Sequence, residues 1–304
     1  IRLAVDLRPG HAASWVALGL AERYRGDTEA EVKALRKALS IEPGHPGASV
    51  HLAWRLNEQN DTKGARAILL AVPEAARSGD HWKRLARLAA RAGEDEVAVA
   101  AYVQSGRLEP HDRQVYDELW KITARRKRFG AFNAAMAEIL GDQETAYWAH
   151  YYLGFSRLDD GKPEEAVTAF GEAARLNPSL TSARGMMAQV LAVHLKDVER
   201  GVALYCEVLI DEPANERARL AIAEVAMLRA KDGRHAEAGT LFEVLVRADP
   251  SNPYHRMNLA LTFKERGEFE KALSIYLEAE EEFPFEPQIP NDRGLLLMGK
   301  GRHE

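Results

Sequence analysis

The sequence predicts an all-α fold, an α-solenoid of antiparallel helix pairs, and two observations carry this prediction. The first is a phrase of 18 residues that opens on glycine, closes on proline and recurs through the chain. It reads GEDEVAVAAYVQSGRLEP at 93–110, GKPEEAVTAFGEAARLNP at 161–178 and GEFEKALSIYLEAEEEFP at 267–284. The second is a period of 34 residues that glycines and prolines follow elsewhere in the chain. A fixed period in this range is the signature of stacked repeats.

The glycines and prolines divide each period into two helices. Glycines recur at 26, 93, 161, 233, 267 and 301, and Asn60 fills the slot missing between the first two. A glycine just after a helix supplies the positive φ that ends it, and asparagine is the best substitute there. Prolines recur half a period out of phase at 9, 43, 110, 178, 213, 250 and 284, where they prevent the second helix from continuing.

Small residues recur within both helices of the period. Two helices cross closely only where side chains are small, so these positions predict the contact within each pair. In the first helices they are Gly19, Ala53, Ala86, Gly154, Ala188, Ala226, Ala260 and Gly294. In the second helices they are Ala65, Ala98, Ala166, Gly201, Ala238 and Ala272.

The segments SWVALG (14–19), HWKRLA (81–86) and HYYLGF (150–155), with a downstream A-x3-F and proline, resemble the tetratricopeptide repeat. The resemblance covers essentially the whole chain and implies a right-handed solenoid. Eight repeats are expected over 12–286, with starts near 12, 46, 79, 113, 147, 182, 219 and 253. Residues 1–11 are expected to end a preceding helix, and 287–304 to form the first helix of a further, truncated repeat.

Several units depart from the pattern. The first has Glu31 where a small residue is expected, so its helices should cross less tightly. The fourth, 113–146, lacks the proline, has Lys127 in place of the glycine and Phe132 at the small position, and is the expected hinge. Short insertions at 195–200 and 214–218 suggest longer turns or helix starts.

Both ends of the array are expected to be bare, because solenoids need polar capping units. Leu295, Leu296 and Leu297 would then lie partly exposed. A chain with such ends is expected to be part of a longer array, to be covered by another molecule, or to self-associate through them.

Composition and motifs argue against catalysis. The formal net charge of the 304 residues is −5, divided as +2 over 1–152 and −7 over the rest. The ten histidines and the single Cys206 form no metal-binding spacing, and no phosphate loop or nucleophile motif occurs. We therefore expect no enzyme, no cofactor and no metal. No apolar run is long enough to span a bilayer, so no membrane insertion is expected. A cytoplasmic location is favoured, although a chain that begins at Ile1 carries no information from its N-terminus.

The resemblance implies that the first helices line a concave groove. At the groove-facing positions the sequence places a basic band, an aromatic group and two further residues of the second unit. The band is Lys83, Arg84, Arg87, Arg91, Lys121 and Arg125; the aromatic group is Trp148, Tyr151, Tyr152 and Phe155; the two others are His51 and Trp54.

Each of these features has two interpretations. The band is either a solvated face paired with Glu94, Asp95 and Glu118, or a clamp for an acidic or carboxylate-ended peptide with an apolar anchor. The aromatic group either covers the irregular fourth unit or forms a binding platform. Single-stranded nucleic acid would also suit basic and aromatic residues, but the negative chain argues against it.

The sequence therefore predicts an interaction scaffold that binds a peptide or a partner helix in its groove. The alternative is a substrate-docking or targeting region of a larger multidomain enzyme whose catalytic domain lies outside this chain.

Overall fold

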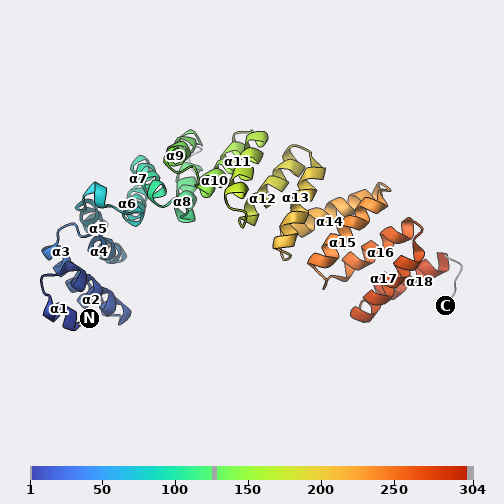
Figure 1. Ribbon diagram of the computed structural model, residues 1–304, viewed down its shortest axis with the longest axis horizontal. Coiled ribbons are helices and arrows are strands. Elements are labelled where there is room, and N and C mark those ends of the chain that lie inside the picture. The colour runs from blue at the N-terminus through green and yellow to red at the C-terminus, as the bar shows by residue number, and fades with distance from the viewer. Residues whose placement is uncertain (1, 125–128, 300–304) are drawn as a thin grey trace. The chain divides into compact units, whose positions relative to one another are not determined.

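The computed structural model describes residues 2–124 and 129–299, and within these ranges it contains helices and no strands. Gly301, Arg125 and Lys127, which entered the sequence predictions, lie outside the described residues. The chain divides into two compact units, Ile1–Asp160 and Gly161–Glu304. Within each unit, consecutive helices pack side by side and alternate in direction through short turns, as an α-solenoid requires (Figure 1).

Unit 1 holds the first ten α-helices. They are α1 (Arg2–Leu7), α2 (Ala12–Tyr24), α3 (Thr28–Ile41), α4 (Pro46–Glu58), α5 (Thr62–Leu70), α6 (Gly79–Arg91), α7 (Asp95–Leu108), α8 (Arg113–Ala124), α9 (Phe129–Asp142) and α10 (Tyr147–Asp159), with a 3-10 turn η1 (Glu74–Ala76) between α5 and α6.

Unit 2 holds the remaining eight. They are α11 (Pro163–Leu176), α12 (Thr181–Gln189), α13 (Val198–Asp211), α14 (Glu216–Lys231), α15 (His235–Ala248), α16 (Pro253–Glu265), α17 (Phe269–Glu282) and α18 (Gln288–Gly299), with a π-helical turn η2 (Val190–His194) that continues α12.

The glycine stops adopt the left-handed conformation that the sequence predicted. The glycines at 26, 93, 161, 233 and 267 have φ between 72° and 80°, and Asn60 has φ 64°. Lys196, with φ 59°, takes the corresponding place in the sixth pair, which the sequence did not reveal. A lysine can hold this conformation only at a cost, since its Cβ crowds the neighbouring carbonyl.

The two insertions are absorbed in different ways. The first is preceded by the π-turn η2, which accommodates extra chain inside the helix, and Lys196 then ends that helix. The second supplies the start of α14, where Asn215 caps the helix by accepting a 3.1 Å hydrogen bond from the backbone nitrogen of Ala218.

The helices of a pair meet at the small residues. Ala65, Ala86 and Ala98 are completely buried. At Gly201 the two helices approach closely, because a Cβ there would lie 2.9 Å from the carbonyl oxygen of Ala188. No side chain fits such a gap, so the small residues set the distance between the helices.

The first pair is not looser than the others, contrary to the expectation drawn from Glu31. A Cβ on Gly19 would lie 3.0 Å from Leu35, so this glycine supplies the close crossing. Glu31 is fully buried and instead binds Arg55 on α4, whose Nε donates to its carboxylate at 2.9 Å. The residue that breaks the repeat pattern thus joins the first pair to the second.

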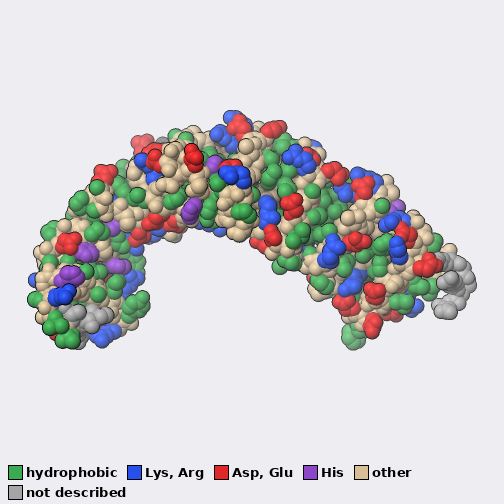
Figure 2. All heavy atoms as spheres, viewed as in Figure 1, with side chains coloured by type: hydrophobic (Ala, Val, Ile, Leu, Met, Phe, Trp, Pro, Cys, Tyr) green, Lys and Arg blue, Asp and Glu red, His purple; other side chains and the backbone are tan. Residues whose placement is uncertain are grey.

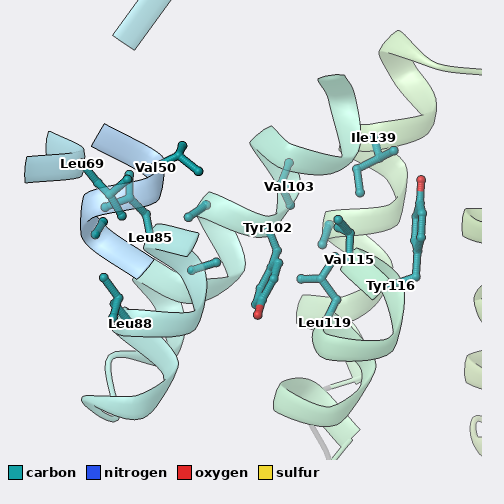
Figure 3. Packing of buried hydrophobic residues seen from close by; sticks show 14 of the residues in the cluster. Val50, Leu69, Leu85, Leu88, Tyr102, Val103, Val115, Tyr116, Leu119 and Ile139 are labelled. Atoms are coloured by element: carbon teal, nitrogen blue, oxygen red, sulfur yellow. The ribbon is translucent and has the colours of Figure 1, made fainter. Parts of the chain in front are cut away.

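Each unit has its own apolar core. In unit 1, Leu85 of α6, Tyr102 of α7 and Leu119 of α8 belong to one continuous cluster (Figure 3). Phe132, the bulky residue of the fourth pair, is buried there with its ring edge-on to Trp120 at 5.2 Å. In unit 2, the core is centred on Tyr205, Ile222 and Phe242, and a smaller cluster surrounds Tyr276.

The leucines of α18 correct a second expectation. Leu296 and Leu297 are buried, because α18 packs on α16 and α17, and only Leu295 of the three is exposed. The argument for self-association that rested on these leucines is therefore weakened.

Replacing Ala98 by Leu should destabilise the protein by about 1–3 kcal/mol, since the added atoms overpack a closed crossing. The measurement is the free energy of unfolding in urea. The matched control is Ala100→Leu on the exposed side of the same helix, which should stay close to wild type. Equal stability of both variants would contradict the placement of the crossing at Ala98.

Candidate functional site

Four residues of the basic band lie on α6, and the structure neutralises two of these four. The Lys83 ammonium is mostly buried and forms an ion pair with Asp112 in the turn before α8, with Asp80 and Glu109 at 3.8 Å. The Arg84 guanidinium pairs with Asp80, one turn earlier on α6, at 2.9 Å. The charges of both side chains are therefore neutralised by ion pairs within the protein.

Arg87 and Arg91 lack such partners. Arg91 donates to the Asn57 side-chain oxygen on α4 at 2.9 Å. One terminal nitrogen of Arg87, Nη2, is buried and makes no hydrogen bond within residues 2–124 and 129–299. Neither guanidinium forms an ion pair with a carboxylate in those ranges, so both can take an anionic ligand.

The interpretation of the band as a face paired with Glu94, Asp95 and Glu118 is not supported for these two arginines. Glu94 pairs with Arg66 of α5, and Glu118 pairs with Lys121 at 2.9 Å. Both carboxylates are thus engaged by other cations. Asp95 lies at the start of α7 and lines the same hollow as Arg87.

Two cavities meet at Arg87 and Arg91, and together they form what we term the basic groove. The first, of about 170 Å³, lies between α4, α5 and α6 and has an apolar floor. The second, of about 550 Å³, lies between α6, α7 and α8. The first is lined by Ala53, Trp54, Asn57, Leu69, Arg84, Arg87, Leu88 and Arg91. The second is lined by Arg87, Ala90, Arg91, Gly93, Asp95, Tyr102, Glu118, Lys121 and Ile122.

Tyr102 lies at the boundary of the core and the groove. Burial raises the pKa of its hydroxyl to about 12, with the Glu118 carboxylate adding to the rise and the Arg87 guanidinium opposing it. The hydroxyl oxygen is buried and has no well-aligned hydrogen-bond partner among the described residues. Tyr102 therefore stays a neutral hydroxyl beside the Arg87 guanidinium.

Trp54 supplies the aromatic surface of the groove. The Arg23 guanidinium lies 3.7 Å from the centre of its ring and that of Arg55 4.6 Å. His51, one turn earlier on α4, is half-buried, and its pKa is lowered by burial and by the nearby charges of Arg23 and Arg84. This end of the groove therefore presents an aromatic ring among cations.

The aromatic group of α10 does not join the basic groove. Tyr152 is buried, stacks on Tyr116 at 6.2 Å, and donates its hydroxyl to Asp117. Trp148, Tyr151 and Phe155 are half-buried against the core of α8 and α9. None of the four lines either cavity, which favours the interpretation that they cover the irregular fourth pair.

Of the predicted site residues, the structure thus brings Trp54, Arg84, Arg87, Arg91 and Lys121 together. Sequence reasoning missed Asn57 and Arg23. Both occupy the twelfth position of their repeats, which the resemblance already assigned to the groove, so the same positional rule would have found them.

Within its described part the chain has no group of histidine, cysteine and carboxylate side chains that could hold a metal ion. Nor does any described helix have the length and hydrophobicity to cross a membrane. Cys206 is half-buried and burial raises the pKa of its thiol, which makes it a poor nucleophile.

Comparison with known proteins assigns the repeats. A family model described as tetratricopeptide repeat matches residues 25–92, and another with the same description matches 190–253 and 226–287. Together these segments cover more than half of the chain. The chain belongs to the tetratricopeptide repeat family. A tetratricopeptide repeat array is in general a scaffold for protein interaction and is typically not catalytic.

Two solved tetratricopeptide repeat proteins are similar to this chain. The C-terminal part of one from Cytophaga hutchinsonii is 15% identical, with a TM-score of 0.52 over 80% of this chain and 99% of that one. Another, from Parabacteroides merdae, is 14% identical, with a TM-score of 0.39 over 94% of this chain and 98% of that one.

A curated relative is similar over a shorter segment. The probable biofilm formation methyltransferase WspC of Pseudomonas putida is 39% identical over 72 residues. The match covers 24% of this chain and 17% of that protein, so this chain spans only a small part of its relative.

A buried histidine holds the N-terminal end of α6, the helix that carries Arg87 and Arg91. His81 is 2% exposed; its Nδ1 accepts from the Ser78 backbone nitrogen at 3.3 Å, and its Nε2 lies 3.0 Å from the Pro46 carbonyl oxygen. These contacts need the neutral ring with its proton on Nε2. Burial accordingly lowers the pKa of His81.

We expect this histidine to make folding sensitive to acid. Because its folded pKa lies below the unfolded value of 6.5, its contribution to stability is present above about pH 6.5 and is lost as the pH falls toward the folded pKa. One such proton changes the free energy of unfolding by at most about 1.4 kcal/mol per pH unit. The free energy of unfolding, measured in urea at pH values between about 8 and 5, should fall less steeply with falling pH for His81→Gln than for wild type. The control is His11→Gln, which replaces an exposed histidine. Its free energy of unfolding should depend on pH as that of wild type does.

Proposed function

We propose that the protein binds an acidic or carboxylate-ended peptide, or a partner helix of that character, in the basic groove of unit 1. The observation that carries the proposal is the pair Arg87 and Arg91, two unpaired guanidinium groups shared by both cavities. Guanidinium groups bind carboxylates through paired, charge-assisted hydrogen bonds.

The two cavities differ in chemistry, which suggests how such a ligand would lie. The smaller one has an apolar floor that includes Leu69 and Leu88, with Trp54 beside it. It suits an apolar side chain of the ligand. The larger one adds the Tyr102 hydroxyl as a donor beside the Lys121–Glu118 ion pair, and it suits the carboxylate. The apolar anchor is thus proposed to contact Trp54 rather than Tyr151 or Phe155 of α10.

Electrostatics favour an anion in this groove. A guanidinium nitrogen that is buried without a partner loses the hydrogen bonds it would make with water, and a ligand oxygen would restore them. Of the carboxylates near Arg87, Glu118 and Asp80 are engaged by Lys121 and Arg84, and Asp95 is a further acidic residue of the larger cavity. We expect no binding of nucleic acid, since the chain as a whole is negative.

A second candidate role is that of a docking region in a larger enzyme. It is favoured by the similarity to a 72-residue segment of a methyltransferase-named protein. The complete open reading frame tests it: a catalytic domain in the same reading frame would support this role, and an uninterrupted array of repeats would oppose it.

The basic groove is tested by removing its two unpaired cations. The partner is first isolated from native lysate and reduced to its binding peptide. Arg87→Ala with Arg91→Ala should then weaken binding by about 1–3 kcal/mol for each charge pair lost, as measured by calorimetric titration. The loss should shrink as salt rises, because screening acts over about 8–10 Å.

The matched control removes two exposed cations of the same unit, through Lys63→Ala with Arg36→Ala. It changes the net charge equally but leaves the groove intact, so binding should stay near wild type. Circular dichroism verifies that both double variants fold. Equal affinity of the two double variants would refute the groove.

A further inference from the structure

The turn between α17 and α18 exposes an aromatic ring that the repeat does not require. Phe285 is 97% exposed and directly follows Pro284. A ring held in water forgoes the free energy that burial against apolar groups would give. In the other repeats the residue after this proline is small or polar: Gly10, Gly44, His111, Ser179, Ala214 and Ser251. The geometry of the repeat therefore does not account for the ring at this position.

The exposed ring lies among carboxylates. α17 ends in Glu280, Glu281 and Glu282 with no basic residue in its last turn, and Glu286 directly follows Phe285. Acidic side chains at a helix C-terminus lie at the negative end of the helix dipole, which is unfavourable within the chain itself. Figure 2 shows acidic and hydrophobic side chains together at the end of unit 2 that holds α17 and α18. We term residues 281–287 the acidic turn.

The carboxylates around the turn divide into two kinds. Glu280 and Glu282 form ion pairs with arginines of α18 and α16, at 3.0 Å and 2.7 Å, and these pairs hold the end of α17. Glu281 is exposed, and Glu286 accepts a long hydrogen bond of 3.5 Å from the backbone nitrogen of Gln288. Within residues 2–124 and 129–299, neither Glu281 nor Glu286 forms an ion pair. These two carboxylates can therefore pair with a cation of another molecule.

The acidic turn has the chemistry that the basic groove of unit 1 requires of a ligand. The smaller cavity of the groove has an apolar floor beside Trp54, which suits a ring, and Arg87 and Arg91 line both cavities. A buried nitrogen of Arg87 has no hydrogen-bond partner among the described residues, and a carboxylate oxygen would supply one. Phe285 and Glu286 offer the ring and the carboxylate from consecutive positions.

The distribution of charge favours contact between two copies of the chain. The net charge is +2 over 1–152, which holds the basic groove, and −7 over 153–304, which holds the acidic turn. Opposite halves of two copies therefore attract each other, and like halves repel. This complementarity selects a second copy as the occupant of the groove.

We propose that the acidic turn of one copy docks in the basic groove of a second copy, with the Phe285 ring in the smaller cavity and the Glu286 carboxylate on Arg87 and Arg91. The proposal names a ligand for the basic groove and so rests on the function proposed above. The turn and the groove are different surfaces, so the contact is heterologous. Each docked copy leaves one groove and one turn open to further copies.

Sedimentation velocity of the full chain tests the association. At about 0.1 M salt, wild type should form species larger than a dimer, whose share grows with protein concentration and falls at about 0.5 M salt because the charges are screened. Phe285→Ala removes the ring, and Arg87→Ala with Arg91→Ala removes the cations. Each variant should lower the association constant about tenfold or more, as expected for loss of an anchor or of a desolvated charge pair.

A mixture of the two variants locates both surfaces. The Phe285→Ala copy keeps an intact groove, and the copy with Arg87→Ala and Arg91→Ala keeps an intact turn. The mixture should therefore form a one-to-one complex that does not grow further, because only one of its contacts is complete. The control is Ile210→Ala, which replaces a 79% exposed apolar residue at the end of α13 and should associate like wild type.

Three results would overturn the proposal. They are a wild type that stays monomeric at every concentration, a mixture of the two variants that forms no complex, and association that Phe285→Ala abolishes while the arginine variant does not change it. None of these results refutes carboxylate binding by the basic groove, since a different acidic ligand would still lose affinity for the arginine variant in the calorimetric titration. Loss of the proposed function itself appears there, as equal affinity of the arginine variant and its control.

Discussion

The close crossing of the two helices in each pair is the contact on which the rest of this protein depends. It is made at residues such as Ala65, Ala98 and Gly201, where nothing larger fits between the helices. Helices that approach this closely bury their apolar faces completely, and each pair can then pack its remaining apolar surface against the next pair. The fold is thus a sum of local contacts repeated along the chain.

A consequence of this arrangement is that the exposed positions of the first helices are released from packing. They can vary from repeat to repeat without changing the fold. In unit 1 they carry arginines around Trp54, and in unit 2 they carry exposed leucine, methionine and tyrosine, of which Met227 and Leu261 line a cavity of about 360 Å³. One repeated scaffold therefore presents two surfaces of different chemistry.

Two buried ionisable side chains, Glu31 and His81, connect neighbouring repeats. Glu31 of α3 is fully buried, a position that costs several kcal/mol for an unpaired carboxylate, and it is balanced by Arg55 of the next repeat. His81 connects α6 to α4 in a similar way through its neutral ring. Both contacts act between repeats, where the periodic apolar pattern alone leaves some freedom, and both lie next to the basic groove.

The sequence by itself determined the helices, their stops and the family. These features are local, because a helix, its glycine stop and its proline boundary are set by residues within a few positions of one another, and the 34-residue period repeats them. The left-handed Gly93 and Asn60 were predictable for this reason, whereas Lys196 was not, since lysine has no preference for positive φ.

Only the tertiary structure decided which of the candidate residues remain available to a partner. Lys83 is neutralised by Asp112, 29 residues away, and Tyr152 is buried with its hydroxyl on Asp117, 35 residues away. Those distances are close to one repeat, so each pairing depends on the contact between neighbouring repeats and not on the pattern within one. The sequence thus assigned basic and aromatic residues to the first helices. The packing between repeats determines that Lys83 and Tyr152 take part in contacts within the fold, while Arg87 and Arg91 line the cavities.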